Sequence, residues 1–225
     1  MRRYKHYSFD LWLTLIKSNP MFKEQRDAMF FDLYNPKGIP SEKVRAIVAG
    51  QDVKANQLSE STGIHVPVEH IVGGVLNELG YVPINIDVIS MIVDSIQSLF
   101  LKHPPILYDT NTRSVLEELH DDGSRLSILS NTGFIKGTTV RQFLAEINIG
   151  DIFANEYFSD ELMLSKPHKR AFIQMVNSDP ACRTHLLNGE LIHVGDNPVA
   201  DGASVLAGIP FFQINSNEKT IKDLL

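Results

Sequence analysis

The sequence predicts an α/β protein in which a doubly wound parallel sheet carries an inserted block of helices. Three observations predict this fold class. A short apolar and aromatic segment runs into Asp10, as expected of a buried strand. Helical periodicity without a strand signal then extends from Asn19 to about His103. From Thr110 onward helices and apolar strands alternate, and strands separated by whole helices pair in parallel.

The first strand ends at an acid, Asp10. Residues 6–16 are rich in apolar and aromatic types, so the carboxylate is expected at the carboxyl end of a buried strand. The helical stretch behind it has breaks at residues 38–40, 62–63 and 80–83, which divide it into about four helices.

The last of these helices is expected from Ile84 to Leu101, because its apolar residues recur at intervals of three and four. The pair Pro104-Pro105 cannot continue a helix and leads into the second region. The predicted domains are therefore an α/β core, residues 1–16 and 104–225, and a helical lid, residues 17–103. Such a lid lies over the sheet edge where folds of this class bind ligands.

The second region repeats helix and strand up to the end of the chain. The expected helices are one with Val115, Leu116 and Leu119, then Lys136 to Ile147, Lys169 to Val176 and Asp201 to Ala207. The expected strands are Leu126 to Ser130, Ile152 to Phe158, Leu191 to Val194 and Phe211 to Ile214. Each crossover between parallel strands places a helix on a face of the sheet, so both faces should be covered.

Composition narrows the classes of function. The chain has 225 residues, of which 43% are hydrophobic and 21% charged, as in an ordinary soluble globular protein, and it contains no apolar run that could span a bilayer. A net charge of −6 and the lack of a basic run argue against nucleic acid as a partner. No secretory segment precedes Phe9, and Cys182 alone cannot form an internal disulfide. We therefore expect a cytoplasmic protein with a small-molecule ligand and no membrane partner; monomer and homodimer remain open.

Polar side chains stand at or just after the ends of several predicted strands. They are Asp10, Ser130, Lys166, Asp196 and Asp201. The carboxyl ends of parallel strands meet at one edge, so these residues can share a site although they lie far apart in the chain. Carboxylates gathered this closely repel one another unless a cation neutralises them, and hard oxygen ligands suit Mg²⁺. The sequence therefore predicts a magnesium site.

In these motifs the chain resembles the haloacid dehalogenase superfamily, over nearly its full length. The motifs follow in the family's order: Asp10 with Thr14 in D-x-x-x-T, Ser130 in Leu129-Ser130-Asn131-Thr132-Gly133, Lys166-Pro167, and Gly195-Asp196 with Asp201. The helical insert resembles the α-helical cap of subfamily I, which includes phosphoglycolate phosphatases and haloacid dehalogenases. The resemblance implies a Rossmann-like core with such a cap.

The resemblance also implies a role for each motif residue. Asp10 would be the nucleophile that attacks phosphorus and becomes an aspartyl phosphate, which water then hydrolyses. Ser130 and the backbone amide of Asn131 would bind phosphoryl oxygens, and Lys166 would hold the charge of the nucleophile and the phosphoryl group. The activity expected is that of a Mg²⁺-dependent phosphatase acting on a small phosphorylated metabolite.

The same resemblance implies the ligands of the metal ion. The carboxylates of Asp10 and Asp196 would bind Mg²⁺, with Asp201 bound directly or through water. The remaining protein ligand would be the backbone carbonyl of residue 12, so the side chain of Trp12 need not disturb the metal site.

Trp12 departs from the phosphatase pattern. The family's phosphatases have an aspartate there, which protonates the leaving group and activates water, a role worth about 10²–10⁴ in rate. Two alternatives therefore stay open: a catalytically impaired phosphate-binding or regulatory protein, and, more weakly, a metal-independent haloacid dehalogenase. Trp12 itself would either contact substrate or pack at the domain junction.

Two histidines of the core region are expected to lie outside the site. His193 lies inside an apolar strand and is expected to be a core histidine with its hydrogen bonds satisfied. His168 is expected to be an exposed residue at a helix start rather than a base.

Overall fold

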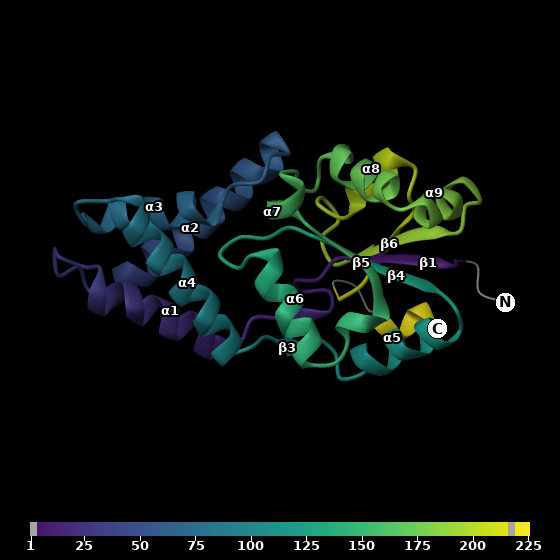
Figure 1. Cartoon of the computed structure of the whole chain (residues 1–225), viewed down its shortest axis with the longest axis horizontal. Helices are drawn as coiled ribbons and strands as arrows, with labels where there is room; N and C mark the ends of the chain where they lie inside the picture. Colours follow the sequence, from purple (N-terminus) through teal and green to yellow (C-terminus); the bar gives the residue numbers. More distant parts are fainter. Residues whose placement is uncertain (1–3, 216–218) are drawn as a thin grey trace.

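The computed structural model of the chain describes residues 4–215 and 219–225. In this described part, five parallel strands form one sheet in the order β5-β4-β1-β6-β7 (Figure 1). Their bounds are His6–Phe9 for β1, Arg125–Ser130 for β4, Phe153–Phe158 for β5, Leu191–Gly195 for β6 and Phe211–Gln213 for β7. The predicted parallel α/β core is therefore confirmed.

Strand β1 occupies the centre of the sheet. It pairs with β4 from His6↔Arg125 to Phe9↔Ile128, and with β6 on its other side. All of its residues are buried, as expected for a parallel strand covered on both faces. Its side chains His6 and Ser8 form hydrogen bonds to the neighbouring strands, His6 through Nε2 to Ser127 and Ser8 to His193. Both neighbours hold β1 so that its carboxyl end leads directly into Asp10.

Helices cover both faces of the sheet. In Figure 1, α5 (Thr112–Asp121) and α6 (Gly137–Glu146) lie on one side, and α8 (Lys169–Ser178) and α9 (Pro180–Leu187) lie on the other. The short helix α7 (Ser159–Leu162) follows β5 directly. This arrangement leaves the carboxyl ends of the strands open towards the helical insert.

The insert consists of α1 (Pro20–Leu33), α2 (Ser41–Thr62), α3 (Val68–Leu79) and α4 (Ile86–Lys102). These helices stand together beside the sheet edge in Figure 1. Both connections to the core run through one ribbon, in which β2 (Ile16–Lys17) pairs antiparallel with β3 (Ile106–Leu107). The helices fall inside residues 17–103, and the division into two domains at these boundaries stays a prediction. We call this insert the cap.

Some elements differ from the expected ones. Residues 202–207 form a 3₁₀ helix rather than an α-helix, because the segment is only six residues long and 3₁₀ geometry serves in such short pieces. Helix α9 was not predicted, although Pro180 at its first position and the Asp179 side chain, which accepts from Ala181 N, are ordinary helix-start features. The ribbon β2–β3 was also missed, because each strand is two residues long.

Within the described residues, none of the helices has the length and apolar character needed to cross a membrane.

His6 is a fully buried titratable residue in the central strand. Its Nε2 lies 3.0 Å from Ser127 Oγ, and its ring packs edge-on against His185 with the centroids 5.6 Å apart. Its Nδ1 has no hydrogen-bond partner among the described residues. Burial, reinforced by His185, lowers the pKa of His6 to about 4. The folded protein therefore keeps this imidazole neutral at pH values where an unfolded chain protonates it.

We expect the free energy of unfolding to decrease as the pH is lowered from 6.5 to about 4. These limits are the ordinary pKa of histidine and the pKa of His6 in the folded protein. In this window only the unfolded chain takes up the proton, so the loss grows as the pH falls and reaches about 3 kcal/mol at its lower end. The variant His6→Gln should flatten this part of the profile, measured by urea unfolding. The exposed His120→Gln should retain it, and an unchanged slope in His6→Gln would contradict the assignment.

Candidate active site

The carboxylate of Asp10 lies at the carboxyl end of β1, where only 6% of the residue is exposed. Its Oδ1 accepts hydrogen bonds from Ser130 Oγ at 3.1 Å and from Lys166 Nζ at 2.8 Å. Its Oδ2 accepts from Thr14 Oγ1 at 3.0 Å. Burial raises the pKa of Asp10, and the Lys166 ammonium opposes that rise. Three of the predicted site residues therefore meet at one oxygen.

Lys166 lies in the loop between α7 and α8, and its side chain extends to the carboxyl end of β1. Its side chain is 2% exposed, and its Nζ lies 2.8 Å from Asp10 Oδ1 and 2.5 Å from Asp201 Oδ1. Burial alone would lower the pKa of this ammonium, but Asp10 and Asp201 outweigh burial and raise it. The lysine is therefore charged and is shared between two carboxylates.

Asp10, Asp196 and Asp201 form an acidic cluster in which one oxygen of each lies within 4.8 Å of the others. Burial, followed by the charges of Asp10 and Asp201, raises the pKa of Asp196 to about 6. For Asp201, burial works in the same direction, but Lys166 and His193 outweigh it and hold the pKa below its usual range. Lys166 supplies one positive charge to three acids, which leaves a need for a further cation.

The ligand types and their free positions fit Mg²⁺. Asp201 already accepts from Lys166 and His193 on Oδ1 and from the backbone of Asn197 on Oδ2, so it is held firmly in place. Among the described side chains, the Thr14 hydroxyl, which is shared with Asp10, is the group in hydrogen-bond contact with the Asp196 carboxylate, at 3.3 Å. Asp10 and Asp196 are therefore the better direct ligands, and Asp201 suits a contact through water. The carbonyl of Trp12 remains a proposed ligand.

Thr14 links the two proposed metal ligands. Its Oγ1 lies 3.0 Å from Asp10 Oδ2 and 3.3 Å from Asp196 Oδ1, and it accepts from Asp196 N at 3.1 Å. The sequence identifies this threonine as part of the D-x-x-x-T motif but does not indicate its contact with Asp196. Its spacing of four residues from Asp10 was the available signal.

The side chain of Asn131 forms two hydrogen bonds with the backbone of Lys166. Its side chain donates to Lys166 O at 2.8 Å and accepts from Lys166 N at 2.9 Å. We call residues 130–132 the Asn131 loop and residues 163–166 the Lys166 loop. The amide therefore fixes these two loops against each other, a contact between predicted site residues that the sequence did not indicate.

His193 is a buried core histidine, as expected, and it also contacts one of the site carboxylates. It is fully buried on β6, its Nδ1 lies 3.0 Å from Ser8 Oγ, and its Nε2 lies 3.3 Å from Asp201 Oδ1. Burial lowers the pKa of His193, so the ring is neutral, and the ionised Asp201 can only accept. Nε2 therefore carries the proton and supports Asp201 from behind. His168 is the N-cap of α8, at the expected helix start, but it is half-buried rather than exposed.

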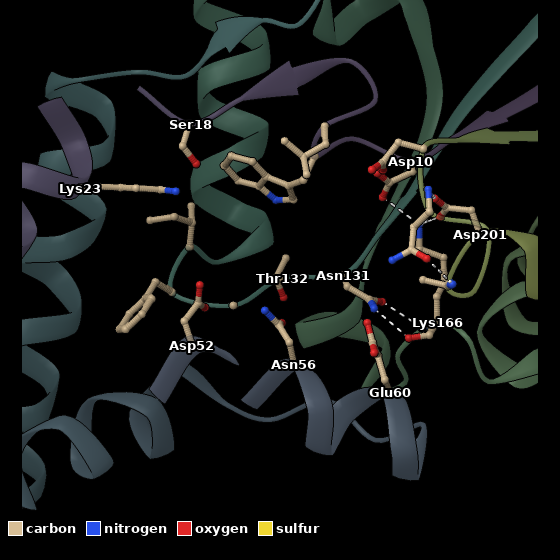
Figure 2. A pocket seen from close by; sticks show the side chains of 18 of the residues that line it. Asp10, Ser18, Lys23, Asp52, Asn56, Glu60, Asn131, Thr132, Lys166 and Asp201 are labelled. Carbon is tan, nitrogen blue, oxygen red and sulfur yellow. Dashed lines mark hydrogen bonds and ion pairs between the residues drawn. The ribbon is translucent and has the colours of Figure 1, made fainter. Parts of the chain in front are cut away.

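A cavity of about 320 Å³ lies between this cluster and the cap. Figure 2 shows Asp10, Asn131 and Lys166 on its core side, and Lys23, Asp52 and Glu60 reaching towards it from the cap. Lys23 forms no ion pair with another described residue, and burial raises the pKa of Asp52 against the opposing charges of Arg26 and Lys23. The cap side of the cavity is therefore polar and carries charges of both signs.

Trp12 lines the same cavity and also packs at the domain junction. Its ring lies edge-on to Phe100 of α4, with the centroids 6.1 Å apart, and Phe100 in turn contacts Phe22 and Phe143. Both roles considered for this residue are therefore compatible with its position. Its indole has an N–H but no group that can act as a general acid or base.

Comparison with known proteins gives a family match. Residues 9–214 match the model of the haloacid dehalogenase-like hydrolases. Curated protein sequences give no significant match.

Solved structures with the same fold include enzymes of different activity. The chain is 18% identical to the haloacid dehalogenase (HAD) family hydrolase YfnB from Bacillus subtilis, which was solved with magnesium. The two structures match with a TM-score of 0.69, over 97% of this chain and 92% of YfnB. It is 18% identical to a predicted phosphoglycolate phosphatase from Haemophilus somnus (TM-score 0.65; 100% and 92% covered). It is 19% identical to a 2-haloacid dehalogenase from Pseudomonas syringae (TM-score 0.63; 96% and 89% covered). At these identities the similarity establishes the fold.

We expect Mg²⁺ to stabilise the protein more at pH 7.5 than at pH 5, because Asp196, with a pKa of about 6, must lose its proton before it binds the ion. At a Mg²⁺ concentration of 100 times Kd and pH 7.5 the Tm should rise by about 5 °C. Calorimetry with and without a chelator measures this shift.

The variant Asp196→Asn is the matched control. It should abolish the Mg²⁺ shift and, without Mg²⁺, raise the Tm at pH 7.5, because it removes one of three mutually repelling charges. A Tm of the wild type that does not respond to Mg²⁺ at pH 7.5 would count against the metal site.

Proposed function

The chain belongs to the haloacid dehalogenase-like hydrolase family, and we propose that it is a Mg²⁺-dependent phosphatase that acts on a small phosphorylated metabolite through Asp10. The observation that carries this proposal is the environment of the Asp10 carboxylate. It is held by Lys166, Ser130 and Thr14, and two further acids lie beside it. This is an arrangement for placing a nucleophile and a divalent cation against a phosphoryl group.

The proposed reaction has two steps at phosphorus. In the first, a carboxylate oxygen of Asp10 forms a bond to phosphorus as the bond to the ester oxygen breaks, and the leaving group departs as an anion that takes its proton from water. In the second, water attacks the aspartyl phosphate, inorganic phosphate leaves and the carboxylate is restored. When bound, Mg²⁺ supplies positive charge that offsets the repulsion between the nucleophile and the phosphoryl oxygens.

The chain's own residues serve these steps by position and charge. The Lys166 ammonium is held 2.8 Å from Asp10 and can stabilise negative charge that develops on the phosphoryl oxygens. The Ser130 hydroxyl and the backbone of the Asn131 loop are the proposed phosphoryl-oxygen donors. The cap excludes water from the cavity while Asp10 reacts.

Trp12 limits which leaving groups are handled well. Without an acid at residue 12, the departing oxygen has to leave as an anion or take its proton from water. Acyl and aryl phosphates release more stable anions than alkyl phosphates do. We therefore propose that the protein favours them, and the polar cap side of the cavity suits a small polar leaving group.

The second candidate is a phosphate-binding or regulatory protein with little turnover. The observation in its favour is Trp12, since the rest of the proposed phosphate and metal site can bind without the missing acid. Metal-independent dehalogenation is the weaker alternative, because Lys166 alone would then have to offset the charges of three clustered carboxylates.

We expect Asp10→Asn to abolish turnover of an aryl phosphate in the presence of Mg²⁺, because the neutral amide cannot form the aspartyl phosphate. The decrease should be at least about 10³-fold, by analogy with the loss of other activated nucleophiles. Steady-state assays of p-nitrophenyl phosphate and acetyl phosphate measure it. Turnover that survives in Asp10→Asn would refute the assignment of the nucleophile.

We expect Trp12→Asp to raise kcat for alkyl phosphates by about 10²-fold, because it supplies the missing proton donor. Aryl and acyl phosphates should gain much less. Trp12→Phe, which restores no acid, is the control. If the wild type turns over none of these substrates and Trp12→Asp turns over alkyl phosphates, the binding-protein alternative is correct.

A further inference from the structure

The cap contacts the core at a second place, far from the β2–β3 ribbon. The end of α2 and the loop to α3 lie beside α7 and the Lys166 loop (Figure 1). Ser165 N donates to Gly63 O at 3.0 Å, His65 N donates to Met163 O at 3.5 Å, and Ile64 forms an antiparallel bridge with Leu164. We call this contact, residues 63–65 against 163–165, the clasp. It joins the cap to the residue that precedes Lys166.

The approach of the two segments depends on Gly63. This residue ends α2 in the left-handed region at φ 71°, and its N–H donates to Ser59 O. A Cβ at this position would overlap the side chain of His168. Glycine therefore serves both requirements of the clasp, a left-handed helix end and close contact with the segment after Lys166.

His65 extends the clasp into the core. The residue is 4% exposed, and its Nδ1 lies 3.0 Å from the Oγ of Ser159, the first residue of α7. That same Oγ accepts from Thr132 N at 2.8 Å and lies 3.1 Å from Thr132 Oγ1. Thr132 Oγ1 in turn donates to Asp160 Oδ1 at 3.0 Å. A chain of hydrogen bonds therefore leads from the cap to the Asn131 loop.

The direction of this chain follows from the number of protons available. Thr132 Oγ1 donates to Asp160 Oδ1, so the single hydroxyl proton of Thr132 is used there. Ser159 must then donate its own proton to Thr132 Oγ1, and its Oγ is left as the acceptor for both Thr132 N and His65 Nδ1. His65 is therefore the donor. His65 Nδ1 has Ser159 as its partner only while the cap is docked.

The clasp reaches both loops that carry proposed phosphate-binding groups. Through Gly63 and Ser165 it contacts the backbone beside Lys166, and through His65 and Ser159 it contacts the backbone beside Asn131. The two loops are joined to each other by the Asn131 side chain. These contacts form one closed network, so movement of the cap loop is transmitted to both sides of the phosphate site.

We propose that His65 is a positioning residue, which through Ser159 holds the Asn131 and Lys166 loops in their docked arrangement and so makes the phosphate site depend on cap docking. Its catalytic consequence rests on the proposed phosphatase function, whereas its structural consequence does not. His65 does not contact the proposed reacting atoms. The ordinary alternative is that the clasp is passive packing and that the two loops keep their positions without it.

The first experiment tests the structural consequence in the full-length protein without substrate, by amide hydrogen exchange. His65→Ala should speed the exchange of the Thr132 and Ser165 amides about fivefold, as expected from the loss of one hydrogen bond. His65→Asn places an amide N–H near the position of Nδ1 and should restore exchange to within about twofold of the wild type. Acceleration confined to residues 63–66 in His65→Ala, with Thr132 and Ser165 unchanged, would overturn the proposal.

The matched control is Glu69→Gln. It removes a neighbouring ion pair between cap and core, in which Glu69 and Lys136 lie 3.0 Å apart and are 35% and 37% exposed. Such an exposed pair contributes little, so Thr132 and Ser165 should exchange as in the wild type. If Glu69→Gln accelerates them as much as His65→Ala does, the effect is general loosening of the cap, and the role assigned to His65 is wrong.

The second experiment tests the catalytic consequence with p-nitrophenyl phosphate and Mg²⁺. His65→Ala should lower kcat/KM about fivefold and His65→Asn should restore it. If wild-type protein turns over no phosphoester, the proposed function fails while the exchange experiment still decides the role of His65. If exchange changes as expected and kcat/KM does not, the dependence of the phosphate site on docking is refuted.

Discussion

One buried ammonium group organises the edge of the sheet. Lys166 is almost inaccessible to solvent, and its Nζ is placed between Asp10 and Asp201. A charged lysine in such a place is stable only with its partners, and each carboxylate is stable there only with the lysine or another cation. Removal of Lys166 leaves two buried carboxylates without their shared cation, and removal of either carboxylate takes from the ammonium one of its two partners. The positions of Asp10, Asp201 and the loop that carries Lys166 therefore depend on one another.

The supports of this group come from separate parts of the chain. Asn131 holds the backbone of Lys166, His193 holds Asp201 from behind, and Thr14 joins Asp10 to Asp196. These hydrogen bonds all join one protein group to another. They reduce the freedom of the charged groups, which is how a site acquires fixed geometry before its ligand arrives. The cap adds a further support through the clasp.

The sequence predicted the sheet and the gathering of its polar residues because both follow from local signals and a topological rule. The apolar run before Asp10 indicates a strand, and parallel strands bring their carboxyl ends together. The contact between His193 and Asp201 has no such signal. A histidine between apolar neighbours has the same pattern whether it only packs or also supports a carboxylate, and the outcome depends on the turn from Gly195 to Asp201. The clasp was missed for a similar reason, since Gly63 was seen only as a helix break.

The central position of β1 governs the order in which the molecule can assemble. Its neighbours β4 and β6 begin at Arg125 and Leu191, whereas β1 ends at Phe9. During synthesis the cap helices, whose contacts are local in sequence, emerge complete while β1 still lacks both pairing partners. The nucleophile's strand acquires its second neighbour only when most of the polypeptide has left the ribosome. Until then its unpaired edges are exposed, which makes this short segment a hazard for aggregation in the nascent chain.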